Sequence, residues 1–177
     1  MIRNTSPPEG EKSFTDLSAL IRAADGLSLA QVCSLTGLEQ STIQNWIKRG
    51  FVPHPERKRY FERHLARILL IDAMRDCMLI ERVGALMAYI NGNADDTADD
   101  CIGEEALYEL FYDTVREACG CCAAPDQLGE ISERCVREQV SDPAAAERII
   151  PALTIMVGAH IAARYKTEAD RLYDTII

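Results

Sequence analysis

The residues of this chain best suited to chemistry are four cysteines in its second half. The segment CGCC contains Cys119, Cys121 and Cys122, and Cys135 follows. Thiolates bind soft metals and are open to oxidation, so the cluster is a candidate metal or thiol-redox sensor. Cys119 and Cys122 form one C-x-x-C pair, but a structural zinc site needs two such pairs. The alternative is a group of reduced thiols around a helix end, and we predict no resident metal or cofactor.

Other arrangements that carry catalysis do not occur in the sequence. His54, His64 and His160 are scattered, and there is no Ser/His/Asp order, phosphate-cradling glycine loop or HExxH motif. His160 lies in an apolar run, where a histidine is more often a satisfied core residue than a ligand. We therefore expect a protein that is not an enzyme.

The charge of the chain is strongly uneven. Its 177 residues carry a formal net charge of −9, which opposes attraction of the whole protein to nucleic acid or to an anionic membrane. Residues 41–75, however, hold eight Lys and Arg against three Asp and Glu, whereas the residues after 75 hold eight against twenty. An anionic ligand should therefore meet the protein at residues 41–75.

This basic segment begins within a pattern typical of two short helices. Ser28 and Gln31 form a capping-box pattern for the first helix, which Gly37 ends. The second helix is expected from about Gln40 to Arg49. Its inward residues are Ile43, Trp46 and Ile47, and its outward residues are Gln40, Ser41, Gln44, Asn45 and Lys48. The pair predicts a helix-turn-helix, whose second helix can lie in the major groove of DNA. There Gln and Asn pair with adenine edges, while Lys and Arg contact guanine or phosphate.

The stretch FVPHPERKRYF that follows contains two prolines, which forbid continuation of the helix. We predict a short β-like wing that exposes Arg57, Lys58 and Arg59. Residues 62–92 then predict a long helical region. Its expected inward residues are Leu65, Ile68, Leu69, Leu79, Val83, Leu86 and Met87.

In this order of elements, TGLEQSTIQNWIKRGFVP resembles the DNA-binding domain of MerR-type transcription regulators. The longer stretch STIQNWIKRGFVPHPERKRYFERHLARILLIDAMRD is similar to the bacterial family catalogued as domain of unknown function 1836, a MerR-like offshoot. The resemblance covers about residues 27–92. It implies a recognition helix facing DNA and a wing whose return touches the DNA backbone at Arg59 and Tyr60. Trp46 falls on a family aromatic and is more readily a core residue than a DNA contact. The expected DNA-binding residues are Thr42, Gln44, Asn45, Lys48, Arg49, Arg57, Lys58, Arg59 and Tyr60.

The sequence departs from the MerR pattern in two ways. The wing is short, and Ser41 and Gln44 stand where arginines are common, which reduces the expected grip on phosphate. In addition, Asn91-Gly92-Asn93 interrupts the chain where MerR proteins continue into a long dimerisation helix. The usual MerR dimer is therefore not implied.

Further helices are expected on both sides of the basic segment. A short leading helix begins at Ser13 and stops at Asp25-Gly26. After an acidic linker, three helices are expected, the last beginning with Pro143 in its first turn. Pro151 should kink this helix or divide it. Residues 149–163 are almost continuously apolar but too short to span a bilayer, which indicates a core helix or a subunit interface.

These observations predict an all-α protein. We expect a MerR-like winged helix-turn-helix with a short wing at residues 13–92, an acidic linker at 93–100, and an acidic helical domain at 101–177 for homodimerisation or an unknown effector. No secretory signal or membrane span is apparent, so we expect a cytoplasmic location. The expected function is transcription regulation through binding of duplex DNA. The alternative is a non-enzymatic module that binds another protein through the same surface.

Overall fold

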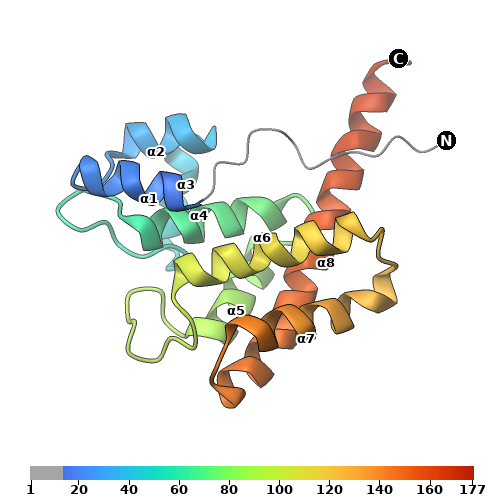
Figure 1. The fold of residues 1–177 in the computed structure, drawn as a ribbon. Helices are drawn as coiled ribbons and strands as arrows, with labels where there is room; N and C mark the ends of the chain where they lie inside the picture. Colours follow the sequence, from blue (N-terminus) through green and yellow to red (C-terminus); the bar gives the residue numbers. More distant parts are fainter. Residues whose placement is uncertain (1–13) are drawn as a thin grey trace.

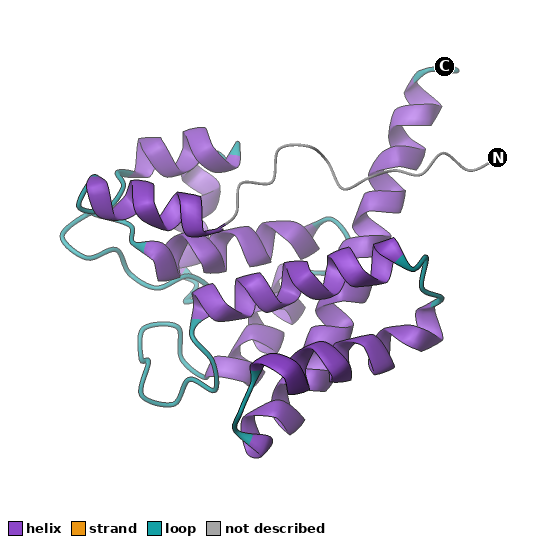
Figure 2. Ribbon diagram, viewed as in Figure 1, coloured by secondary structure: helices purple, strands orange, loops and turns teal. Residues whose placement is uncertain are grey.

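The computed structural model describes residues 14–177, and Figure 2 shows only helices and loops over this range. The expected all-α class is confirmed. The predicted N-cap Ser13 lies outside the described residues. The helices are α1 (Phe14–Ala23), α2 (Leu29–Thr36), α3 (Gln40–Lys48), α4 (Glu62–Arg75), α5 (Ile80–Asn91), α6 (Glu104–Gly120), a single 3₁₀ turn η1 (Pro125–Gln127), α7 (Leu128–Gln139) and α8 (Pro143–Asp174).

Local signals account for α2 and α3. The Ser28 hydroxyl accepts from the Gln31 backbone N–H, and the Gln31 side chain accepts from the Ser28 N–H at 2.8 Å, so the predicted capping box is confirmed. Gly37 ends α2 with φ +74°, a left-handed conformation that favours glycine. On α3, Ile43 and Trp46 are buried, which confirms Trp46 as a core residue.

The helical region predicted at residues 62–92 consists of two helices. The chain turns at residues 76–79, and α5 returns to pack against α4. Leu79 was expected to face inward, but it lies in this turn and its side chain is 68% exposed. The helical period therefore identified the residues of α4 and α5 but not the break between them.

Helices from both halves of the chain share one core. In Figure 1, α1, α2 and α3 lie together at one end, with α4 and α6 running through the middle of the molecule. The cluster of buried apolar residues runs without interruption from Phe14 to Ala159, and α4 packs against α6 and α8. The division into domains at residues 93–100 stays a prediction.

Helix α8 is not divided at Pro151, which was one of the two outcomes expected there; the expected kink stays a prediction. Proline removes the bond to the carbonyl four residues earlier, here that of Glu147. Because Pro151 is exposed, water can satisfy this carbonyl. By length and composition α8 also meets the usual criterion for a membrane-crossing helix, although the apolar run at residues 149–163 is too short by itself. Of the most apolar window of α8, 44% is buried in the protein. Core helices of soluble proteins meet the same criterion.

A buried guanidinium joins α4 to α6 and to the segment after α3, and the last residue of α5 contacts the same carboxylate. Arg67 of α4 is 2% exposed, donates from Nε to the Phe51 carbonyl at 2.7 Å, and forms an ion pair with Glu104 at the start of α6. Asn91, the last residue of α5, donates to the Ile102 carbonyl at 2.7 Å and lies 3.4 Å from Glu104 Oε1. Burial raises the pKa of Glu104, an effect that the charge of Arg67 opposes. Phe51 follows α3, so this network fixes α3 relative to the helical body.

A second buried polar side chain, His64, holds the loop between α3 and α4. Its Nδ1 accepts from the Phe61 N–H at 3.0 Å, which leaves the ring proton on Nε2 to bond the His54 carbonyl at 3.0 Å. His64 is 1% exposed. The neutral ring thus joins the two ends of the segment that contains Arg57, Lys58 and Arg59.

Breaking the Arg67–Glu104 pair from one side should destabilise the protein strongly. We expect Arg67→Met or Glu104→Leu alone to lower the free energy of unfolding by about 3–5 kcal/mol, because each leaves a buried polar group without its partner. The double variant should lose less than either single variant. Urea unfolding measures all three. Arg22→Met, at the Arg22–Glu62 pair where Arg22 is 78% exposed, is the control and should cost less than about 1 kcal/mol. Additive losses in the double variant would contradict this coupling.

Protonation of His64 should weaken the fold in mildly acidic solution. Burial lowers the pKa of His64 in the folded protein, whereas in the unfolded chain the pKa of this histidine is about 6.5. Between the two values the unfolded chain binds more protons. The free energy of unfolding therefore falls as pH drops through this window, and the full stability is present above it. Urea unfolding between about pH 5 and 8 should show this decline in the wild type and not in His64→Phe. Parallel curves would exclude His64 as its source.

Candidate nucleic-acid interface

The exposed face of α3 is formed by polar side chains. Ile43 and Trp46 anchor the helix in the core, which turns Ser41, Gln44, Asn45 and Lys48 outward, as expected. Thr42 is half-buried, so it offers less to a ligand than the sequence suggested. Amide side chains on a rigid helix can donate and accept hydrogen bonds at the same time, which suits recognition of base edges.

The C-terminal end of α3 is fixed by Phe51. Its ring lies against Gly84 of α5, where a Cβ would collide with it, and its carbonyl accepts from Arg67. Arg49 stacks over the same ring, 4.6 Å from the centroid, and pairs with Glu81 at 2.6 Å. This hydrogen bond lowers the pKa of Glu81. Arg49, a predicted DNA contact, is therefore already engaged within the protein.

The predicted short wing is a tight hairpin. Glu56 and Arg59 exchange both backbone hydrogen bonds, at 3.0 and 2.8 Å, and enclose Arg57 and Lys58. These two residues have φ values of +51° and +66°, as in a type I′ turn, which normally selects Asn and Gly. Both side chains are exposed. The hairpin thus presents two cations from a strained backbone.

The base of the hairpin is buried. Tyr60 pairs with Leu27 through two backbone hydrogen bonds of 2.8 Å, and its side chain is only 4% exposed. Burial raises the pKa of its hydroxyl. The expectation that Tyr60 touches DNA is therefore corrected, because the side chain belongs to the core. Arg59 is exposed, and its Nη1 lies 3.4 Å from the Gly26 carbonyl.

An acidic loop lies beside the hairpin. His54 bonds Asp95 twice, from its backbone N–H at 2.7 Å and its ring Nδ1 at 2.9 Å, while Arg63 donates to the Ala94 carbonyl at 2.6 Å. The backbone N–H of His54 is the main cause of a lowered pKa for Asp95. The loop at residues 93–100, expected to be a linker, is thereby attached to the basic segment. A polyanion must approach from the side of α3 and the hairpin tip, away from these carboxylates.

Fewer cations are free than the sequence suggested. Arg49, Arg63, Arg67 and Arg75 of residues 41–75 bond other groups of the protein. In the described part of the chain, Lys48, Arg57 and Lys58 form no ion pair, and neither does Arg59, whose guanidinium lies near the Gly26 carbonyl. A charge count does not distinguish these two groups, because the partners of Arg49, Arg63 and Arg67 come from distant segments. The partners of His64 and Arg67 are also distant in sequence, so the charge count did not identify these two residues as the ones that position the site.

The cysteine cluster lies away from this surface. Cys119, Cys121 and Cys122 are exposed around the C-terminal end of α6, at the opposite end of that helix from α1 to α3 in Figure 1. Cys135 is buried on α7, with its Sγ 3.1 Å from Glu117 Oε2. Within residues 14–177, no group of three or more His, Cys, Asp or Glu side chains is arranged to hold a metal ion.

Comparison with known proteins gives a family but no activity. No solved structure matches the chain. One similar protein is "Uncharacterized protein YkrK" of Bacillus subtilis (strain 168), which is 35% identical over 87 residues, or 47% of this chain. The matched region spans only 37% of that relative's length. A family model described as "Domain of unknown function (DUF1836)" matches residues 23–111, from the end of α1 to the middle of α6, and the protein belongs to this family.

Proposed function

We propose that this protein regulates transcription by binding duplex DNA through a MerR-like winged helix-turn-helix, with α3 as recognition helix and the hairpin at residues 56–59 as wing. The proposal is non-enzymatic and places the protein in the cytoplasm. The observation that carries it is the hairpin tip. Arg57 and Lys58 have left-handed backbones, which cost of order 1–2 kcal/mol for each residue with a side chain. Strain of this kind is commonly retained where function requires it.

The neighbouring contacts support the same use. The hairpin is held by its backbone pairing with Leu27 and by His64, while α3 is held through Phe51. Both elements are therefore preorganised relative to each other. We infer that Gln44 and Asn45 read bases and that Lys48, Arg57 and Lys58 contact phosphates. The acidic remainder of the chain disfavours non-specific binding.

A second candidate is a module that binds an acidic segment of another protein. The observation that favours it is the small number of free cations, together with the acidic loop that His54 holds through Asp95 beside the hairpin. This surface is less basic than residues 41–75 suggest from their sequence. The two candidates differ in whether a duplex DNA sequence is recognised at all.

Genomic-fragment selection should distinguish them. Purified protein is incubated with sheared DNA at about 150 mM salt, which suppresses purely electrostatic binding, and the retained fragments are sequenced. We expect a common motif to be enriched. Asn45→Ala should remove this enrichment, because it lowers the free-energy difference between the preferred base and other bases by about 1–3 kcal/mol. Gln139→Ala on α7 is the control and should leave the motif unchanged. A folded protein that enriches no sequence would reject DNA recognition and support the protein-binding module.

Relaxing the hairpin should stabilise the protein and weaken DNA binding together. The double variant Arg57→Asn/Lys58→Gly supplies the residues that a type I′ turn selects, so we expect a gain of about 1–2 kcal/mol in the free energy of unfolding. Loss of two phosphate contacts should reduce the slope of log affinity against log salt by about two. The exchange Arg57→Lys/Lys58→Arg keeps both charges and should keep the slope. An unchanged slope in the Asn/Gly variant would place phosphate binding elsewhere.

A further inference from the structure

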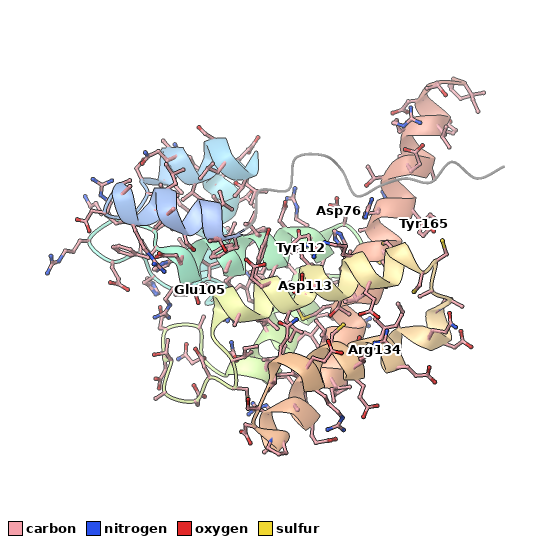
Figure 3. The ribbon with its side chains drawn as sticks, viewed as in Figure 1. Asp76, Glu105, Tyr112, Asp113, Arg134 and Tyr165 are labelled. Carbon is pink, nitrogen blue, oxygen red and sulfur yellow. The ribbon has the colours of Figure 1, made fainter. Side chains whose placement is uncertain are left out.

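Helix α8 extends beyond the body of the molecule. Its last part projects from the other helices as a free rod in Figure 1, and Tyr165, labelled in Figure 3, marks where it leaves them. The residues of α8 from 164 onward are exposed. They include large apolar side chains, with Tyr165 at 75%, Leu172 at 48% and Tyr173 at 62%. Ile176, just beyond the helix, is 80% exposed.

Most of the exposed apolar residues form one stripe along the helix. They recur at alternating intervals of four and three, the spacing by which two helices pack along each other. The stripe consists of Pro151, Ile155, Gly158, Ala162, Tyr165, Ala169, Leu172 and Ile176. All are exposed except Gly158, which is half-buried beside Leu128 of α7, and none is charged. Beside the stripe, Lys166 pairs with Asp170 at 2.6 Å and Arg171 with Glu168 at 2.7 Å, so neighbouring charges are satisfied within the helix.

The stripe ends in an apolar groove on the body. Leu86 and Tyr89 of α5 line it together with Pro151, Ala152 and Ile155 of α8, and it has a volume of about 230 Å³. Tyr89 and Ile155 are each 50% exposed. The groove and the projecting end of α8 thus lie at opposite ends of a single apolar surface.

This surface is complementary to itself when two copies run antiparallel. With a two-fold axis between residues 163 and 164, Ala162 faces the partner's Tyr165, and Ile155 faces the partner's Leu172. Gly158, which lies beside Leu128 of α7, then faces the partner's Ala169. The partner's Ile176 reaches Pro151 at the groove. A parallel pair would instead set each tyrosine against a tyrosine and each alanine against an alanine, which packs less evenly.

The area is sufficient for a stable dimer. The exposed large side chains are Tyr89 of the groove and Ile155, Tyr165, Leu172 and Ile176 of the stripe. They offer about 100–150 Å² each, so with the small residues each copy would bury about 600–800 Å². Both copies together reach the range of about 1,200–2,000 Å² that is usual for specific interfaces. No charge on the stripe needs to be desolvated.

We propose that the protein is a homodimer in which the α8 stripes of two copies pack antiparallel, each C-terminal end lying in the α5–α8 groove of the other. The proposal does not depend on DNA binding, and its test contains no DNA. Sedimentation equilibrium should give twice the chain mass. Leu172→Glu and Tyr165→Glu should raise the dissociation constant at least about 100-fold, because each would bury a charge in the interface. Both side chains are exposed in the single copy, so circular dichroism should show unchanged helix content.

The matched control is Thr167→Glu, which places the same charge on the exposed opposite side of α8 and should leave the dimer intact. Benzoylphenylalanine introduced at Leu172 reports the direction of packing. On irradiation and trypsin digestion, the antiparallel pair yields a cross-link to the peptide of residues 149–164 from a second copy, whereas a parallel pair yields one to residues 172–177. A wild-type monomer, an unaffected Leu172→Glu dimer or a parallel cross-link would each overturn the proposal.

Discussion

The arrangement of the proposed binding surface depends on the buried charge of Arg67. Apolar packing alone allows helices to slide and rotate, but a buried guanidinium must meet its partners in one geometry. Arg67 meets the Phe51 carbonyl beyond α3 and the Glu104 carboxylate at the start of α6. All three residues lie inside the matched family region, which continues past the acidic loop to residue 111. The unit that orients α3 therefore includes part of α6.

Bonds within the protein also reduce the positive charge that the surface offers to a ligand. Three of the eight basic residues in 41–75 bond other parts of the chain, and a loop of opposite charge is attached beside the hairpin. Affinity for any polyanion must then come from a few well-placed cations and from the polar face of α3. A surface of this kind gains more from correct local contacts than from long-range attraction, which agrees with a protein of net charge −9.

The parts of the fold that could be predicted are those determined by neighbours in sequence. Ser28, Gln31 and Gly37 act within one helix, so the bounds of α2 and the burial of Trp46 followed from the pattern. Tyr60 was misassigned because its environment is made by Leu27, far along the chain. The roles of Arg67 and His64 required the same distant information. The number of basic residues available to a ligand was overestimated because most of their partners lie far along the chain. The exposed face of α3 was predicted correctly.

Helix α8 shows why a continuous apolar run has more than one structural solution. Residues 149–163 suggested a helix that needs cover on every side, and α4, α5, α6 and α7 all pack against α8. One side remains open, and the open residues continue the same stripe into the projecting end. The apolar composition of this run thus serves two sides of one helix. One side packs in the core of the molecule, and the other forms the exposed stripe. His160 of α8 bonds the Ala73 carbonyl of α4 at 3.1 Å, so the helix that carries Arg67 also supports this second surface.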